Sequence, residues 1–220
     1  MKTVRVQFKK YGPAKFISHL DLMRFMSRVL RRTKLPVWFT EGFNPRVYLT
    51  FAQPLSLSFE SSCEIMEFRL TKDDFPLGEI ERILSENMPA GLAIRCVGEP
   101  VGKIKDICFA RYEVWFTMEG KSAAEAAAAM ESLLSDPWIE VEKKSKSGMK
   151  MVDIRPMIRS FEVVPEDAYA KLSVIVQSGA QGGLNPSLLL AALQKETGCP
   201  VEQERVCKTD LYDAEMNLFV

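Results

Sequence analysis

Apolar residues recur along this chain with two different periods, and each period predicts a kind of element. Residues 3–8, TVRVQF, alternate between apolar and polar side chains, which is typical of a half-buried strand. Ser18 stands three residues before Asp21, a spacing typical of a helix start. A helical pattern of apolar residues follows, and Pro36 comes after its end. In that pattern the apolar residues fall at helical spacing: Leu20, Met23, Met26, Val29 and Leu30. The sequence therefore predicts a strand at 3–8 and a helix over 19–33.

The first half of the chain continues with three strand patterns and a second helix. We predict strands at 47–52, 63–70 and 92–99, and a helix that Pro76 opens. The resulting order is strand, helix, strand, strand, helix, strand. This is the order of the ferredoxin-like split βαβ unit.

The second half repeats this order with one addition. A strand at 109–118 comes before an alanine-rich stretch that begins at Ser122 and favours a helix. The pair Asn185-Pro186 is typical of a helix start, and a Ser-Lys-Ser-Gly sequence is typical of a hairpin turn. The remaining elements are two hairpins, a helix and a last strand, predicted at 138–144 with 149–156, 160–165 with 168–178, 187–196 and 201–212.

Together these patterns predict an α+β protein of two tandem ferredoxin-like (βαββαβ) halves. Each half has an antiparallel sheet with helices on one face, and the second half carries an extra hairpin. We place the domains at 1–104 and 105–220, joined near Gly102 to Asp106. The 220 residues suit this division, because domains cluster near about 100–150 residues.

Composition narrows the class of protein. With 47% hydrophobic and 26% charged residues the chain can bury proper cores, which excludes disorder and collagen-like repeats. No apolar run approaches the length of a membrane span, and the start MKTVRVQFKK lacks the apolar core of a signal peptide. We expect a cytoplasmic protein without membrane contact. The five cysteines form no metal-binding spacing, so we expect buried reduced thiols.

The charge is balanced overall but unevenly distributed. Lys and Arg together number 29, as do Asp and Glu. Residues 1–50, however, hold eleven basic residues against two acidic ones, an excess of nine, and the other residues carry the opposite excess. A concentrated positive field attracts polyanions. This distribution predicts an anionic partner for the N-terminal half.

Arg24, Arg28 and Arg31 recur at helical spacing, so we expect one row of guanidinium groups opposite the apolar stripe, with Arg32 beside it. Arginine forks bind phosphate oxygens in bidentate geometry, which favours RNA or another polyphosphate as the ligand. The alternative is a solvated helix face in which arginine serves as a helix former. The local excess of positive charge supports the first interpretation.

The loop 41–46, EGFNPR, combines an aromatic residue with an amide and a cation. Phe43 could stack on an unpaired base, Asn44 could hydrogen-bond to it, and Arg46 could bind a phosphate. In the alternative interpretation the loop is a plain turn, with Asn44 before Pro45 as the turn former and Phe43 tucked into the core.

Two other segments have features that structure alone can explain. The loop 179–186, GAQGGLNP, opens a helix N-terminus where an anion could bind, but it matches no nucleotide fingerprint, and a mobile loop is the alternative. Asp153 and Arg155 in VDIRP are expected on one face of a strand that ends at Pro156. A cross-strand ion pair would explain them, and the sequence assigns them no further role.

His19 is the one histidine, and it lies within the basic segment. With Lys15 or Tyr11 it could serve in metal-independent RNA cleavage, although a single histidine is more often a packing or hydrogen-bonding residue. The chain has no cluster, metal or nucleophile motif. We therefore expect no metal, no cofactor and no catalysis within this chain, with His19 as the one weak candidate.

Three stretches carry a resemblance to a known family. They are KYGPAKFISHLDLMRFMSRVLRRTKLPVWFTEGFNPR, LTFAQPLSLSFES and VDIRP. Their central pattern, G-P-x-x-F-x-S-H-L-D followed by G-F-N-P, resembles that of bacterial radical-SAM-linked proteins, a domain of unknown function encoded beside or fused to a radical SAM protein. The resemblance implies an accessory role in RNA or ribosome-related modification. Members commonly carry a histidine after the N-P pair, where this chain has Arg46, so a two-histidine scheme does not carry over.

We therefore expect a non-catalytic RNA-binding accessory protein that works with a separately encoded radical SAM enzyme. The expected RNA-binding residues are Lys15, Arg24, Arg28, Arg31, Arg32, Phe43, Asn44 and Arg46. One alternative is a metal-independent endoribonuclease centred on His19. Another is a protein–protein adaptor whose basic face docks on the radical SAM enzyme.

Overall fold

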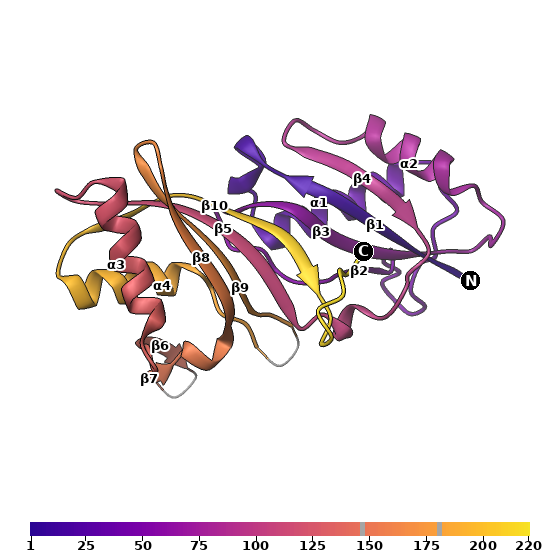
Figure 1. Ribbon diagram of the computed structural model, residues 1–220. Coiled ribbons are helices and arrows are strands. Elements are labelled where there is room, and N and C mark those ends of the chain that lie inside the picture. Colours follow the sequence, from indigo (N-terminus) through magenta and orange to yellow (C-terminus); the bar gives the residue numbers. More distant parts are fainter. Residues whose placement is uncertain (146–147, 180–181) are drawn as a thin grey trace. The chain divides into compact units, whose positions relative to one another are not determined.

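The computed structural model describes residues 1–145, 148–179 and 182–220, and within them the predicted α+β class is confirmed (Figure 1). The strands pair in antiparallel fashion, and the helices include all four predicted from the sequence. The chain divides into two compact units, Met1–Lys105 with Val220 and Asp106–Phe219.

The first unit is a sheet in the order β4-β1-β3-β2, in which every neighbouring pair is antiparallel. A short 3₁₀ turn, η1 (Gly12–Phe16), stands between the first strand and the first helix. The strands are β1 (Lys2–Lys10), β2 (Leu49–Phe51), β3 (Glu60–Leu70) and β4 (Leu92–Gly98), and the helices are α1 (His19–Arg32) and α2 (Leu77–Glu86).

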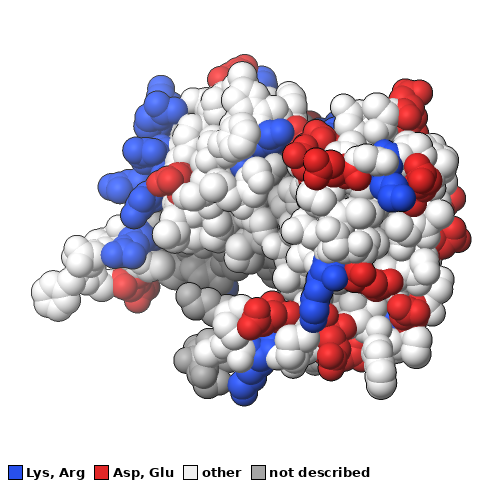
Figure 2. Space-filling view, turned by 90° about the vertical axis from the view of Figure 1, so that its left-hand side faces the viewer, with Lys and Arg blue, Asp and Glu red and all other residues white. Residues whose placement is uncertain are grey.

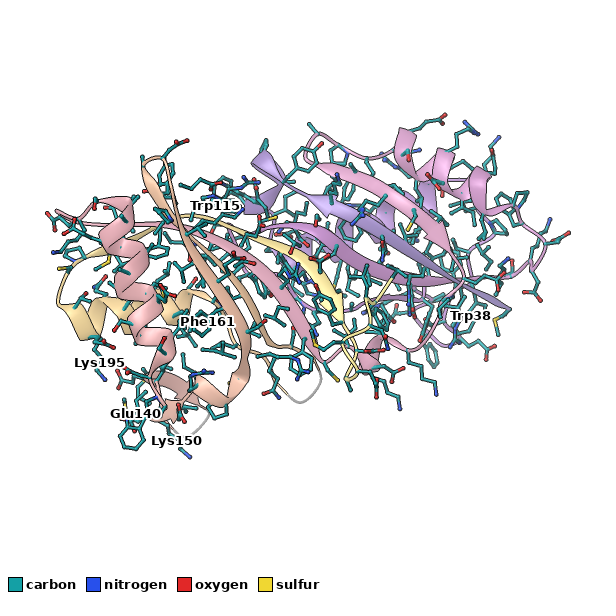
Figure 3. The ribbon with its side chains drawn as sticks, viewed as in Figure 1. Trp38, Trp115, Glu140, Lys150, Phe161 and Lys195 are labelled. Atoms are coloured by element: carbon teal, nitrogen blue, oxygen red, sulfur yellow. The ribbon has the colours of Figure 1, made fainter. Side chains whose placement is uncertain are left out.

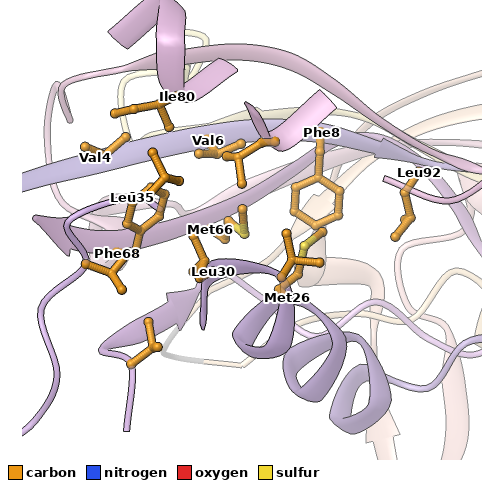
Figure 4. Packing of buried hydrophobic residues seen from close by; sticks show 14 of the residues in the cluster. Val4, Val6, Phe8, Met26, Leu30, Leu35, Met66, Phe68, Ile80 and Leu92 are labelled. Atoms are coloured by element: carbon orange, nitrogen blue, oxygen red, sulfur yellow. The ribbon is translucent and has the colours of Figure 1, made fainter. Parts of the chain in front are cut away.

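The core of the first unit lies between the sheet and both helices (Figure 4). Alternate residues of a strand point to one face, and the inward residues of β1 are fully buried against those of β3. The helices close this face with the apolar stripes that the sequence shows. The main buried residues are Val4, Val6 and Phe8 on β1, Met66 and Phe68 on β3, Met26 and Leu30 on α1, and Ile80 and Leu84 on α2.

The ends of α1 confirm the predicted start and stop of this helix. The Ser18 hydroxyl accepts a hydrogen bond from the Asp21 backbone N–H at 3.2 Å, which satisfies one of the unpaired donors of the first turn. It also donates to the Asp21 carboxylate at 2.7 Å. The helix ends at Arg32, since the chain is already extended at Thr33. Pro36 favours this end, because the residue before a proline is disfavoured in helical conformation.

The second unit is a sheet in the order β10-β5-β9-β8, again antiparallel, with β6 and β7 as a separate two-stranded sheet. A short 3₁₀ turn, η3 (Arg155–Met157), completes it, and another, η2 (Ile104–Asp106), spans the boundary between the units along the chain. The strands are β5 (Phe109–Met118), β6 (Glu140–Ser145), β7 (Gly148–Asp153), β8 (Ile158–Glu166), β9 (Tyr169–Gln177) and β10 (Val201–Tyr212), and the helices are α3 (Ala123–Ser135) and α4 (Ser187–Thr197).

The helices and strands predicted between residues 109 and 212 are present, except that the strand expected over 149–156 ends at Asp153, and the ranges of β5 and β10 agree with the prediction. The N-cap of α4 is Pro186 rather than the predicted Asn185, whose side chain accepts a hydrogen bond from the Ser187 backbone N–H at 3.0 Å. Within the predicted Ser-Lys-Ser-Gly turn, residues 146–147 lie outside the described residues. Residues 180–181 of the 179–186 loop also lie outside them.

The expected placement of Asp153 and Arg155 on one strand face is wrong. Strand β7 ends at Asp153, and Arg155 begins the 3₁₀ turn η3, because Pro156 suits the first positions of a helical turn and cannot continue a strand ladder. The Asp153 carboxylate accepts from the backbone N–H groups of Ile139, at 2.9 Å, and Arg155, at 3.0 Å. The Arg155 guanidinium donates to backbone carbonyls, including that of Asp136 at 3.2 Å. The side chains of Asp153 and Arg155 thus bind the end of β7 to the segment that leads into β6.

Candidate nucleic-acid interface

Helix α1 has one buried face and one cationic face. Leu22, Met26 and Val29 are buried, whereas Arg24, Arg28, Arg31 and Arg32 are exposed. We call Arg24, Arg28 and Arg31 the arginine row, because residues three and four apart lie above one another on a helix. In the space-filling view Lys and Arg side chains gather along the left-hand edge, while Asp and Glu are numerous elsewhere on that face (Figure 2).

The arginine row forms one wall of a hollow of about 510 Å³ on the first unit. Arg46, the last residue of the 41–46 loop, contributes a fourth guanidinium group to the same hollow. We call this the Arg46 hollow; its lining residues are Met23, Arg24, Ser27, Arg28, Arg31, Arg46, Val47 and Leu49. The fold thus brings together four of the predicted RNA-binding residues from two separate segments.

A second hollow of about 450 Å³ lies along α1 and shares two members of the arginine row. We call it the Phe25 hollow; its lining residues are Phe25, Arg28, Val29, Arg31 and Arg32. Arg28 and Arg31 therefore border both hollows. Each hollow combines apolar side chains with guanidinium groups.

The electrostatics of the row are dominated by positive charge. Asp21 pairs with Arg24 at 3.1 Å, and the Ser18 hydroxyl followed by the Arg24 guanidinium lowers the pKa of this carboxyl below its ordinary value. Across the described ranges, Arg28, Arg31 and Arg32 have no ion pair with a carboxylate, and neither does Arg46. These charges are available to an anionic ligand.

The 41–46 loop projects from a closed base. The Thr40 backbone N–H donates to the Arg46 carbonyl at 2.8 Å, and the Arg46 N–H donates to the Thr40 hydroxyl at 3.1 Å. Phe43 is 107% exposed and Asn44 is also exposed, so the alternative in which Phe43 tucks into the core is wrong. Gly42 has φ +123°, a value that side chains disfavour, so the backbone of the loop suits glycine at this position.

Most of this chain matches the model of one protein family. Residues 3–186 match the model of a family described as an uncharacterized protein conserved in bacteria, DUF2344. The chain belongs to the DUF2344 family. No curated protein matches it.

The DUF2344 chain is similar in fold to solved structures at low sequence identity. A chain from the crystal structure of a Cbf5-Nop10-Gar1 complex is 9% identical, with a TM-score of 0.54 over 94% of this chain and 48% of that one. The DUF2344 chain thus spans about half the length of that neighbour. An unknown protein from Galdieria sulphuraria is 13% identical, with a TM-score of 0.27 over 92% of this chain and 97% of that one. The first likeness concerns the fold alone and agrees with the α+β class.

Two further candidates of the DUF2344 chain lie outside both hollows. Lys15 is half-buried in η1, with its ammonium 5.3 Å from the centroid of the Phe16 ring. His19 is the first residue of α1, half-buried, and its ring meets that of Phe51 edge-on at 5.4 Å. This contact gives His19 a packing role in the first unit.

Two basic residues of the first fifty are withdrawn into the interior. Arg5 is 3% exposed; its guanidinium donates to the Glu67 carboxylate at 2.6 Å and to backbone carbonyls that include Gly102 at 2.9 Å. Lys10 is 1% exposed and donates to the Ile17 carbonyl at 2.8 Å. Buried charges persist where they are paired and hydrogen-bonded, so these two residues support the fold.

Sequence reasoning missed the apolar lining of the hollows and an aromatic cluster of the first unit. The Arg69 guanidinium lies 4.2 Å from the centroid of the Tyr48 ring and 5.7 Å from that of Trp38, which Figure 3 places in the first unit. These rings flank the 41–46 loop in sequence, and that spacing is the signal that could have found them. Met23 and Ser27, which line the Arg46 hollow, recur between the arginines at helical spacing.

The cysteines correct one expectation. All five are unbridged thiols, but only Cys63 is buried; Cys96 is exposed and the remaining three are half-buried. Within the described residues no group of His, Cys, Asp and Glu could hold a metal ion. Over the same residues no helix is long and apolar enough to cross a membrane.

Proposed function

We propose that this protein is a non-catalytic RNA-binding protein whose interface is the arginine row with Arg46 and the 41–46 loop. The observation that carries the proposal is the convergence of four guanidinium groups on one hollow without internal carboxylates to neutralise Arg28, Arg31 or Arg46. Placing like charges together is unfavourable unless an anion joins them. A polyphosphate chain supplies such an anion at regular intervals.

RNA suits this arrangement better than a single small anion does. The row is open to solvent and extends along α1, so successive guanidinium groups can meet successive phosphates. Phe43 and Asn44 stand on the loop that ends at Arg46, where they would meet a base attached to the same strand. The phosphate contacts would supply most of the affinity and the loop contacts the orientation.

We further propose that each unit is a ferredoxin-like half. The strand orders β4-β1-β3-β2 and β10-β5-β9-β8 support this, because each places the first and third strands of its four-stranded sheet, counted in chain order, at the centre. In the second unit β6 and β7 are then the extra hairpin, inserted between α3 and β8. Four-stranded sheets of this kind occur in several RNA-binding modules, an analogy that concerns the fold alone.

The salt dependence of binding tests the proposed function. Affinity for total cellular RNA should fall steeply between about 50 and 200 mM salt, because each neutralised phosphate releases counterions. Arg28→Glu should weaken binding at every salt concentration. The matched control is Arg95→Glu, which makes the same charge change at an exposed residue of β4. A flat salt response, or equal loss in the two variants, would contradict the proposal.

The partner that we propose is a radical SAM protein, to which the RNA would be presented. This rests on the resemblance of the KYGPAK to NPR segment, and the proposed RNA interface gives it a physical role. Co-purification of the two proteins after nuclease treatment would indicate direct contact. Co-purification that nuclease abolishes would indicate that RNA bridges them.

A further inference from the structure

We propose that the α1 surface binds an unpaired RNA segment, with nucleobases seated in the Arg46 and Phe25 hollows and phosphates on the arginine row. This deepens the proposed function and rests on it. The juxtaposition that carries the inference is a ridge of shared arginines with a partly apolar hollow on either side.

The hollows have the size and lining of ligand sites. Their volumes of about 450 and 510 Å³ lie in the range of small-molecule pockets, about 300–1,000 Å³. Phe25 provides apolar surface in one, and Met23 and Leu49 provide it in the other. A surface that bound phosphates alone would gain nothing from these apolar walls, whereas a nucleobase has a flat face that would cover them.

The apolar walls distinguish unpaired RNA from a duplex. In an A-form helix the bases are stacked inside, and a protein meets mostly phosphates and 2′-hydroxyls. Unpaired segments can splay their bases outward while their phosphates stay on a cationic ridge. The arginines at the boundary, Arg28 and Arg31, face both hollows, which suits a strand that places bases alternately on the two sides.

The exposed loop extends the same surface. Phe43 is fully exposed on the loop whose last residue, Arg46, lines one hollow. Aromatic rings bind successive bases of single strands by stacking, without regard to sequence. A duplex offers such a ring only its terminal base pair. The loop and the two hollows thus favour the same form of RNA.

Direct comparison of two RNA probes tests this inference. Fluorescence anisotropy would measure binding of a single-stranded RNA of about 12 nucleotides and of a blunt duplex of the same sequence at equal salt. The expected result is tighter binding of the single strand by about tenfold or more, since base stacking adds to the phosphate contacts. Equal affinity, or preference for the duplex, would overturn the inference while the proposed RNA-binding function stands. Binding of neither probe would overturn the proposed function itself.

A hollow-filling variant adds a second measurement. Ser27→Leu places a larger side chain at the Arg46 hollow, keeps every charge, and replaces serine with a better helix former. It should lower affinity for the single strand about tenfold and leave affinity for the duplex unchanged. The control is Ser85→Leu on the exposed face of α2. Equal effects of the two variants, or equal losses for both probes, would contradict occupation of the hollow by a base.

Discussion

Helices α1 and α3 occupy the same place in the order of elements of their units, yet their outward faces differ completely. Both follow the first strand of the unit, both start after a serine cap, and both bury a methionine, Met26 in one and Met130 in the other. Helix α3 nevertheless contains no Lys or Arg, whereas α1 carries four arginines. The fold at this place therefore requires a cap and an apolar stripe, and it does not require the arginine row.

The two caps repeat the contrast. In α3 the cap is reciprocal, because Ser122 and Glu125 each accept from the other's backbone N–H, at 3.3 and 2.9 Å. In α1 the Asp21 carboxylate at the equivalent position binds the Ser18 hydroxyl and Arg24. The acidic residue that completes the cap of α3 thus tethers an arginine of the row in α1.

The buried methionines should show the largest effect and no difference between the helices. Met26→Ala and Met130→Ala each remove a fully buried side chain, and each should lower the free energy of unfolding by about 2–5 kcal/mol. Urea denaturation followed by circular dichroism measures both. If one variant were neutral, the two helices would not be equivalent supports of their cores.

The arginine row should come next in size. Arg24→Gln, Arg28→Gln and Arg31→Gln combined should lower RNA affinity roughly a hundredfold near 100 mM salt and reduce the salt slope, because about three phosphate contacts are lost. Stability should hardly change, since these side chains are exposed.

The control for this variant neutralises three exposed cations elsewhere in the first unit, with Lys9→Gln, Arg82→Gln and Arg95→Gln. It has the same net charge as the row variant. Should it lose as much RNA affinity, total charge rather than the row would determine binding.

A graft onto α3 should have a smaller effect and would sharpen the comparison. Ala124, Ala128 and Glu131 are exposed and share the spacing of the arginine row, so Ala124→Arg, Ala128→Arg and Glu131→Arg reproduce the row in the second unit. Introduced into the variant that lacks the native row, the graft should restore binding of duplex RNA in part, through phosphate contacts.

The same grafted protein should not regain a preference for the single strand, because the Arg46 and Phe25 hollows are not at α3. Anisotropy with both probes provides the measurement. A graft that restored the preference would mean that charge spacing alone selects unpaired RNA.

The α3 cap should give the smallest effect, visible in acid. The Ser122 backbone N–H, followed by its hydroxyl and by Lys121, lowers the pKa of Glu125 below its ordinary 4.5. A carboxyl whose pKa is lowered in the folded state stabilises the protein at pH values above the pKa that it has in the unfolded chain. This contribution disappears as the pH falls through the pKa that it has in the folded protein.

Glu125→Gln should therefore be slightly less stable than the parent near neutral pH, and the gap should close between about pH 5 and pH 3. Urea midpoints across that range would record it. A gap that widened toward acid would show that the sign of the effect is wrong.

The elements of the fold were largely predictable because their signals are local. The apolar stripe of α1, its cap at Ser18 and its end before Pro36 lie within a short stretch of sequence. The same holds for the alanine-rich α3. The 3₁₀ turn at Arg155 was missed because the alternation of residues before Pro156 fits a strand as well as a turn. Only Pro156 itself indicates the turn.

The site was predictable only in part, because its geometry depends on distant segments. Helical spacing gives the arginine row, but Arg46 joins it only through the packing of the segment that leads into β2 against α1. A count of charges in the sequence likewise does not show which of the basic residues are buried. Arg5 and Lys10 contribute to the N-terminal excess in the sequence, yet both are inside the molecule.

The full exposure of Phe43 has a practical consequence. A side chain that is as accessible in the native state as in an extended chain contributes almost nothing to folding, so its replacement leaves the scaffold intact. A photoreactive amino acid placed there would form covalent adducts only with whatever molecule docks on that tip. Mass spectrometry of the adducts from living cells would then identify the natural binding partner directly, whatever its chemistry.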